Sequence, residues 1–83
     1  MGFSVELKPQ AMKDLRQISS ENRGRIFTKL AALEKGLTGD VKKLTGFTFE
    51  YRLRVGDYRV LFEIEGERVI VYRVVHRREA YRR

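Results

Sequence analysis

Apolar and polar residues first alternate and then recur at helical spacing along the first part of the chain. Residues 3–7 alternate apolar and polar side chains, which predicts a short strand. Pro9 stands where a helix can begin, because proline is tolerated at the first helical position. An apolar face at helical spacing follows, formed by Met12, Leu15 and Ile18. The pattern therefore predicts a strand followed by a helix.

A second helix is predicted after a pair of serines. Ser20 can cap it through its hydroxyl group, and Glu21 suits the first turn, where the helix dipole favours negative charge. Gly36 suits its end. The apolar stripe of this helix consists of Ile26, Leu30 and Leu33, widened by Phe27. The two helices are expected to form an antiparallel hairpin with one apolar side.

Residues 37–48 are predicted to be a connection, and three strands are predicted after it. Apolar and polar side chains alternate in residues 49–55 and 58–64, and residues 69–75 are an almost continuous apolar run. The turns between them, such as Gly56-Asp57, are short, which indicates an antiparallel meander. The expected fold class is therefore α+β in the order β-α-α-β-β-β, with an N-terminal helical hairpin packed on a mostly antiparallel four-stranded sheet.

Arginines occupy alternate positions of the predicted central hairpin. A two-residue turn would place Arg54 opposite Arg59, with Arg52 on the same face. Like charges in this position cost roughly 0.5 kcal/mol unless an anion lies between them. Guanidinium groups keep their charge and bind phosphate through two parallel hydrogen bonds. The pattern favours an RNA-binding face over the alternative, a solvated face whose charges splay apart.

The composition restricts the class of protein. Eighty-three residues indicate one small domain spanning residues 1–83. A net charge of +7 is compatible with a polyanion partner and equally with a soluble domain that has a basic surface. The absence of cysteine and the single histidine argue against a disulfide framework or a zinc site. Since the chain also lacks a long apolar segment and a signal-peptide pattern, we expect a cytoplasmic protein without metal or cofactor.

A second basic cluster follows the last predicted strand. In the last third of the chain only arginine carries positive charge, and Arg77 and Arg78 precede Tyr81. If residues 79–83 form a helical turn, Tyr81 lies beside Arg77, and both can reach one phosphate. The alternative is an arginine-rich tail that is frayed or packed on acidic side chains. Likewise, a lone histidine at the end of a strand, such as His76, more often forms structural hydrogen bonds than acts in catalysis.

The order of elements and two sequence motifs resemble the RelE toxins of bacterial and archaeal toxin–antitoxin systems. The motifs are the hairpin YRLRVGDYRVLF at 51–62, shared across the RelE/ParE superfamily, and the ending HRREAY at 76–81, more specific to its RNA-cleaving branch. The resemblance covers nearly the whole chain. It implies a metal-independent endoribonuclease that cleaves mRNA in the ribosomal A site and inhibits translation. Its partners would be the ribosome, mRNA and a cognate acidic antitoxin.

The resemblance also implies roles for individual residues. Arg59 matches the arginine that holds the scissile phosphate, and Arg77 the arginine that assists at the leaving group. Tyr81 matches the tyrosine that stacks on the substrate base and takes part in proton transfer. The further RNA-binding candidates are Arg52, Arg54, Arg78, Arg82 and Arg83, and His76 is a candidate for proton transfer. Some members of the family have lysines where this chain has Arg52 and Arg54. Arginine cannot replace lysine as a general base, because it does not deprotonate.

Two other functions share the expected fold. A ParE-like toxin would inhibit DNA gyrase without cleaving RNA, and a third protein of this fold would bind nucleic acid or an antitoxin without any activity. The ParE-like toxin needs neither the C-terminal tyrosine nor the arginine face. Tyr81 together with Arg77 therefore favours the RNA-cleaving toxin.

Overall fold

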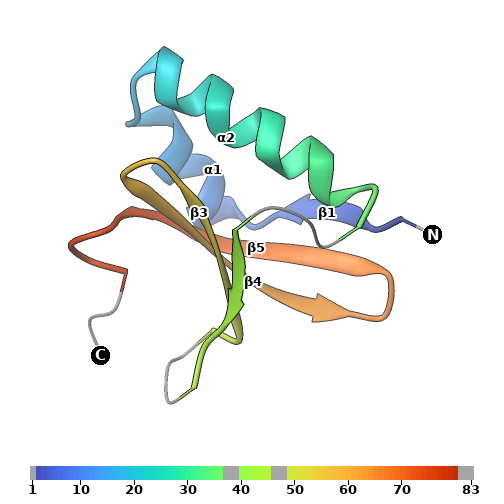
Figure 1. Ribbon diagram of the computed structural model, residues 1–83. Helices are drawn as coiled ribbons and strands as arrows, with labels where there is room; N and C mark the ends of the chain where they lie inside the picture. Colours follow the sequence, from blue (N-terminus) through green and yellow to red (C-terminus); the bar gives the residue numbers. More distant parts are fainter. Residues whose placement is uncertain (1, 37–39, 46–48, 81–83) are drawn as a thin grey trace.

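Two helices cover one face of a five-stranded sheet in the computed structural model of the protein (Figure 1). The structure describes residues 2–36, 40–45 and 49–80. The elements are β1 (Ser4–Leu7), α1 (Pro9–Arg16), α2 (Ser20–Leu33), β2 (Val41–Lys43), β3 (Tyr51–Val55), β4 (Tyr58–Glu65) and β5 (Arg68–His76). The α+β class and the N-terminal pair of helices are confirmed.

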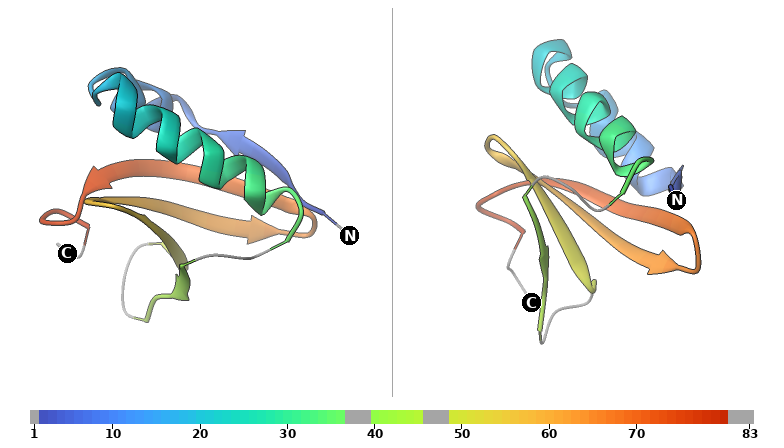
Figure 2. Two further views of the ribbon diagram at one scale, coloured as in Figure 1. Left: turned by 45° about the horizontal axis from the view of Figure 1, so that its top comes forward. Right: turned by 45° about the vertical axis from the view of Figure 1, so that its right-hand side comes forward.

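The strands lie in the order β1-β5-β4-β3-β2, so the N-terminal strand pairs with the C-terminal one (Figure 2). β1 is parallel to β5, and the other neighbouring strands are antiparallel. The expectation of four strands was wrong, because residues 41–43 form β2 within the segment predicted to be a connection. A three-residue strand with two lysines has too little apolar alternation to be recognised from sequence.

Both helices begin at local sequence signals, and the cap of the second helix lies one residue earlier than predicted. Pro9 is the first residue of α1, as predicted. The cap of α2 is Ser19 rather than Ser20, since the Oγ atom of Ser19 accepts hydrogen bonds from the main-chain and side-chain nitrogens of Asn22, at 3.4 and 3.1 Å. Ser20 is instead the first helical residue. At the other end, Gly36 has φ +149°, a conformation that favours glycine, and its N–H donates to the Leu33 carbonyl at 3.1 Å.

The core lies between the helices and the sheet. Its helical part is Ala11 and Leu15 of α1 with Ile26, Leu30 and Leu33 of α2, and Ile18 joins it from the connection between the helices. Its strand part is Leu53, Val55, Val60, Phe62, Val69, Val71 and Val74. Two predicted core positions were wrong, because the side chains of Met12 and Phe27 are 43% and 46% exposed. Each follows a fully buried residue, Ala11 or Ile26, and a step of one residue turns a helical side chain about 100° away from the buried face.

Helix α1 replaces β1 along the second half of β5. The pairing of β1 with β5 ends at Val71, and a bulge follows, since Leu61 pairs with Arg73 while Phe62 pairs with Val71. Beyond the bulge, the carboxylate of Asp14 on α1 accepts hydrogen bonds from the Val74 N–H at 2.9 Å and from the Arg73 guanidinium at 2.8 and 3.2 Å. Partial burial would raise the pKa of Asp14, but these hydrogen bonds outweigh it and lower the pKa.

Candidate nucleic-acid interface

The face of the sheet turned away from the helices, called the open face below, carries the hairpin arginines. Leu53 is buried under the helices, so strand alternation places its neighbours Arg52 and Arg54 on the open face. Val60 is likewise buried, and Arg59 before it belongs to the open face. Arg54 pairs directly with Arg59 in the register of β3 and β4. The hairpin geometry predicted from the two-residue turn is confirmed.

Arg59 is held in place by main-chain carbonyl groups of its own turn. Its Nη1 atom donates to the carbonyl oxygens of Gly56 at 2.9 Å and Tyr58 at 3.0 Å. Its Nε atom is buried and has no hydrogen-bond partner within the described part of the chain. A buried polar atom without a partner is rare and calls for a specific reason. The guanidinium is therefore positioned by the protein while part of its hydrogen-bonding capacity is unused.

Asp40 binds both arginines that precede the turn. Its Oδ1 atom lies 3.3 Å from Arg52 Nη1, its main-chain oxygen accepts from the same nitrogen at 3.1 Å, and its Oδ2 atom pairs with Arg54 Nε. The partial loss of hydration would raise the pKa of Asp40, but the hydrogen bond from Arg52 and the charge of Arg54 lower it. The Arg52 side chain is only 12% exposed, whereas that of Arg54 is 57% exposed. Arg54 can therefore meet a ligand, and Arg52 mainly holds the start of β2.

Arg77 lies at the same end of the sheet as the hairpin turn. Its N–H donates to the Asp57 carbonyl at 2.7 Å, and its Nε atom lies 3.9 Å from the Asp57 carboxylate. Since Asp57 belongs to the turn that also positions Arg59, the structure brings Arg77, Arg59 and Arg54 to one end of the sheet. The Arg77 side chain is 59% exposed and can meet a ligand.

His76 lies on the helix-covered side of the sheet. It follows the buried Val74 by two residues, packs edge-on against the Tyr58 ring at 5.7 Å and borders a cleft of about 210 Å³ with Asp14. Its Nδ1 atom accepts a hydrogen bond from the Arg78 N–H at 3.3 Å. The sheet therefore separates His76 from Arg59, and the geometry gives no support to a joint role in proton transfer. The remaining candidates, Tyr81, Arg82 and Arg83, lie outside the described residues.

The middle of the open face is apolar, a feature that was not predicted from the sequence. Leu61 and Ile70 alternate with core residues and are nevertheless 7% and 2% exposed. Next to them, Phe49 stacks on Tyr72 with ring centroids 5.2 Å apart. The signal was present in the sequence, since Leu61 interrupts the polar positions of its strand. This apolar middle separates the arginines of the turn end from Arg68, which pairs with Glu6 at 2.6 Å and with Glu65 at 3.8 Å.

Two further properties of the described part of the chain bear on its chemistry. Within residues 2–36, 40–45 and 49–80, no group of His, Cys, Asp or Glu side chains is arranged to hold a metal ion. No helix in the same part of the chain is long and apolar enough to cross a membrane.

Comparison with known proteins relates the chain to archaeal toxins. The family described as ParE toxin of type II toxin-antitoxin system, parDE, matches residues 5–81. Toxin RelE3 of Methanocaldococcus jannaschii is 35% identical over 75 residues, which cover 84% of this chain and 85% of the relative.

Solved structures show the same fold. A chain in the crystal structure of the RelB-RelE antitoxin-toxin complex from Methanococcus jannaschii is 31% identical, with a TM-score of 0.77 over 92% of this chain and 94% of the other. A chain in the archaeal RelE-RelB complex from Pyrococcus horikoshii OT3 is 26% identical, with a TM-score of 0.78 over 96% and 100% of the two chains. The chain therefore belongs to the ParE/RelE family of toxins from type II toxin–antitoxin systems and is a toxin of the RelE type.

Proposed function

We propose that the protein is a ribosome-dependent endoribonuclease that cleaves mRNA in the A site, acts in the cytoplasm and is neutralised by an acidic antitoxin. The observation that carries this proposal is the opposition of Arg54 and Arg59 on the open face, with Arg77 at the same end of the sheet. Similarity to a RelE toxin and to chains of RelB-RelE complexes supports the antitoxin as a partner.

The chemistry needs no nucleophile from the protein. The 2′-oxygen of one nucleotide attacks the adjacent phosphorus in line, and the bond from phosphorus to the 5′-oxygen breaks. The products are a 2′,3′-cyclic phosphate and a 5′-hydroxyl group, after one proton leaves the 2′-hydroxyl and another reaches the 5′-oxygen. The protein must therefore hold the in-line geometry and stabilise negative charge on the phosphate.

Arg59 suits the stabilisation of phosphate charge. The carbonyls of Gly56 and Tyr58 fix its guanidinium before RNA arrives, so little reorganisation is needed in the transition state. Arg54 stands opposite and is exposed, so one phosphate can contact both guanidinium groups. Arg77, placed by the turn residue Asp57, is the candidate for stabilising the leaving 5′-oxygen.

The open face has few side chains that can accept or donate a proton in the reaction. Arginine does not deprotonate at biological pH, and His76 lies on the other side of the sheet. The candidates for proton transfer that remain are Tyr81 and the carboxylates of Glu63 and Glu79. A site with well-placed positive charge and few bases gains most from a partner that bends the RNA into the in-line geometry, because positioning alone lowers the barrier. This reasoning favours cleavage on the ribosome over cleavage of free RNA.

A ParE-like gyrase inhibitor is the second candidate, since the matching family is described by the name ParE. The two candidates make different predictions for cells in which the protein is induced. We expect primer extension on translated mRNA to show new 5′ ends within A-site codons, and plasmid supercoiling to stay unchanged. The Arg59→Ala variant, expressed to the same level, should give no such ends. Intact mRNA together with relaxed plasmids would replace the ribonuclease proposal by the gyrase one.

A further inference from the structure

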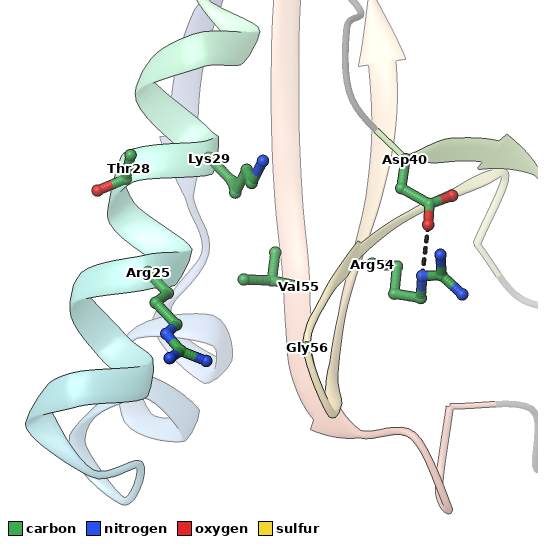
Figure 3. A pocket seen from close by; sticks show the side chains of 7 residues that line it. All are labelled: Arg25, Thr28, Lys29, Asp40, Arg54, Val55 and Gly56. Atoms are coloured by element: carbon green, nitrogen blue, oxygen red, sulfur yellow. Dashed lines mark ion pairs between the residues drawn. The ribbon is translucent and has the colours of Figure 1, made fainter.

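A second basic cleft lies between α2 and the hairpin of β3 and β4 (Figure 3). Its volume is about 410 Å³. Its lining consists of Arg25, Thr28 and Lys29 from α2, together with Asp40, Arg54, Val55 and Gly56. Nothing in the reaction proposed above uses the α2 side of this cleft.

The two basic side chains of α2 face the hairpin together. Arg25 and Lys29 are four residues apart on the helix, so they lie one turn apart on the same side. Figure 3 shows both side chains reaching from the helix toward β3, with Val55 and Gly56 between the helix and Arg54. The cleft is therefore a channel with cations on both walls and an apolar strip between them.

The positive charge of the cleft is only partly neutralised. Arg25 pairs with Glu21 at 3.2 Å, but both side chains are highly exposed, and such pairs contribute little. Asp40 is shared by Arg54 and Arg52, so this cluster keeps a net positive charge. Lys29 has no acidic partner among the described residues. The cleft thus attracts an anion more than a cation or a neutral ligand.

Arg54 connects the cleft with the open face. The pairing of β2 with β3 runs from Val41 opposite Leu53 to Lys43 opposite Tyr51, and beyond it the Arg54 N–H donates to the Asp40 carbonyl at 3.0 Å. Arg54, just beyond this pairing, is opposite Arg59 on the open face and also lines the cleft. The cations therefore follow one another from Arg59 through Arg54 to Lys29, around the edge of the sheet.

We propose that this cleft is a second binding site for RNA phosphates, through which the strand held at Arg59 continues along α2. The inference rests on the proposed RNA-cleaving function, because Arg54 is common to both sites. An RNA strand fits better than an acidic peptide, because the backbone of a bound peptide needs hydrogen-bond donors and acceptors from the cleft. The Thr28 hydroxyl of the cleft is already used as a donor, to the Gly24 carbonyl at 3.0 Å. Successive phosphates, in contrast, need only the spaced cations.

The test compares two double variants with equal loss of charge. Arg25→Gln/Lys29→Gln removes the α2 side of the cleft, and Lys13→Gln/Arg16→Gln removes two exposed cations of α1 that do not line it. The probe is a fluorescent 2′-O-methyl RNA of about 12 nucleotides, a length within the range bound by single-strand sites. It lacks the attacking hydroxyl and cannot be cleaved. Fluorescence anisotropy over a salt series gives the affinity and its salt slope.

We expect the cleft variant to bind the probe about 10-fold more weakly at low salt, with a salt slope reduced by about 1.4, or about 0.7 for each lost phosphate contact. The α1 variant should keep the wild-type slope, and circular dichroism should show both variants folded. Equal slopes in the two variants would overturn the inference. A cleft variant that keeps full affinity for the RNA probe, but binds a glutamate-rich peptide of similar length more weakly, would also overturn it.

A cleavage assay on programmed ribosomes separates this inference from the proposed function. A wild-type protein that cleaves no mRNA, while its cleft variant still loses RNA affinity, would contradict the function and support the cleft. A wild-type protein that cleaves mRNA, while its cleft variant keeps full RNA affinity, would contradict the cleft and leave the function standing.

Discussion

Arg54 and Arg59 lie directly opposite each other in the hairpin of β3 and β4, and each guanidinium has its own internal acceptors. Arg54 pairs with Asp40, and Arg59 donates to the carbonyls of Gly56 and Tyr58. These contacts explain how the hairpin tolerates like charges that would otherwise cost roughly 0.5 kcal/mol. A phosphate that approaches this pair meets two positioned cations whose mutual repulsion it relieves.

Removing the Arg59 side chain should abolish most of the activity. Arg59→Ala is expected to slow single-turnover cleavage on programmed ribosomes by roughly 10²–10³-fold, as for other donors that stabilise transition-state charge. It should also lower the free energy of unfolding by about 1 kcal/mol, because two hydrogen bonds to the turn are lost. Arg16→Ala, which removes an exposed arginine of α1, is the matched control. A wild-type cleavage rate in folded Arg59→Ala protein would remove Arg59 from the site.

Asp14 should make the stability depend on pH in the acid range. Its pKa in the folded state is below the ordinary value of 3.8, so its ionised form stabilises the fold above that value. This contribution is lost as the pH falls through the lower folded-state pKa. Asp14→Asn should therefore cost about 1–3 kcal/mol near neutral pH, by weakening the bonds from Arg73 and Val74. Urea unfolding should show the difference between wild type and variant shrinking below the ordinary pKa; a constant difference would contradict this account.

Asp40 should limit the affinity for RNA. Asp40→Asn removes the carboxylate charge that Arg52 and Arg54 share, and frees Arg54 for phosphate. We expect tighter binding of the 2′-O-methyl probe and a salt slope steeper by about 0.7. Glu67→Gln raises the net charge equally at the exposed turn between β4 and β5, far from the hairpin. The same gain in both variants would show that net charge, and not the release of Arg54, controls the affinity.

Tyr81 separates two roles that the resemblance to RelE toxins implies. Tyr81→Phe keeps the ring, whose stacking on a base contributes roughly 1–3 kcal/mol. It removes the hydroxyl, and proton transfer by such a group typically contributes about 10²–10⁴-fold in rate. We expect partial cleavage with Tyr81→Phe and almost none with Tyr81→Ala, in single-turnover assays on ribosomes. Equal and nearly complete loss in both variants would make the hydroxyl essential and stacking secondary.

Local sequence signals predicted the elements that are long or strongly patterned. Alternation and short turns gave the hairpin of β3 and β4 with its arginine register, and helical spacing gave the buried stripe of α2. The three residues of β2 escaped prediction because their pairing with β3, rather than their own pattern, makes them a strand. Met12 and Phe27 were misplaced because a hydrophobic residue beside a buried stripe looks like part of it.

The acidic partners of the arginines could not be predicted from the sequence. Asp40 meets Arg52 and Arg54 only because β2 folds back beside β3, and Asp14 meets Arg73 only because α1 packs beside β5. Both contacts join residues far apart in the chain, and neither acid has a local signal. The side of the sheet on which His76 lies likewise depends on the register of β5, which a bulge shifts.

Cleavage of mRNA on purified ribosomes tests the central claim most directly. Ribosomes are programmed with a defined mRNA, the purified toxin is added, and the RNA ends are mapped with wild type and with Arg59→Ala. The account predicts a cut within the A-site codon, a 2′,3′-cyclic phosphate on the upstream fragment, little cleavage of the same mRNA without ribosomes, and no cut with the variant. Intact mRNA on ribosomes with folded wild-type protein, together with inhibition of gyrase supercoiling by that protein, would contradict it.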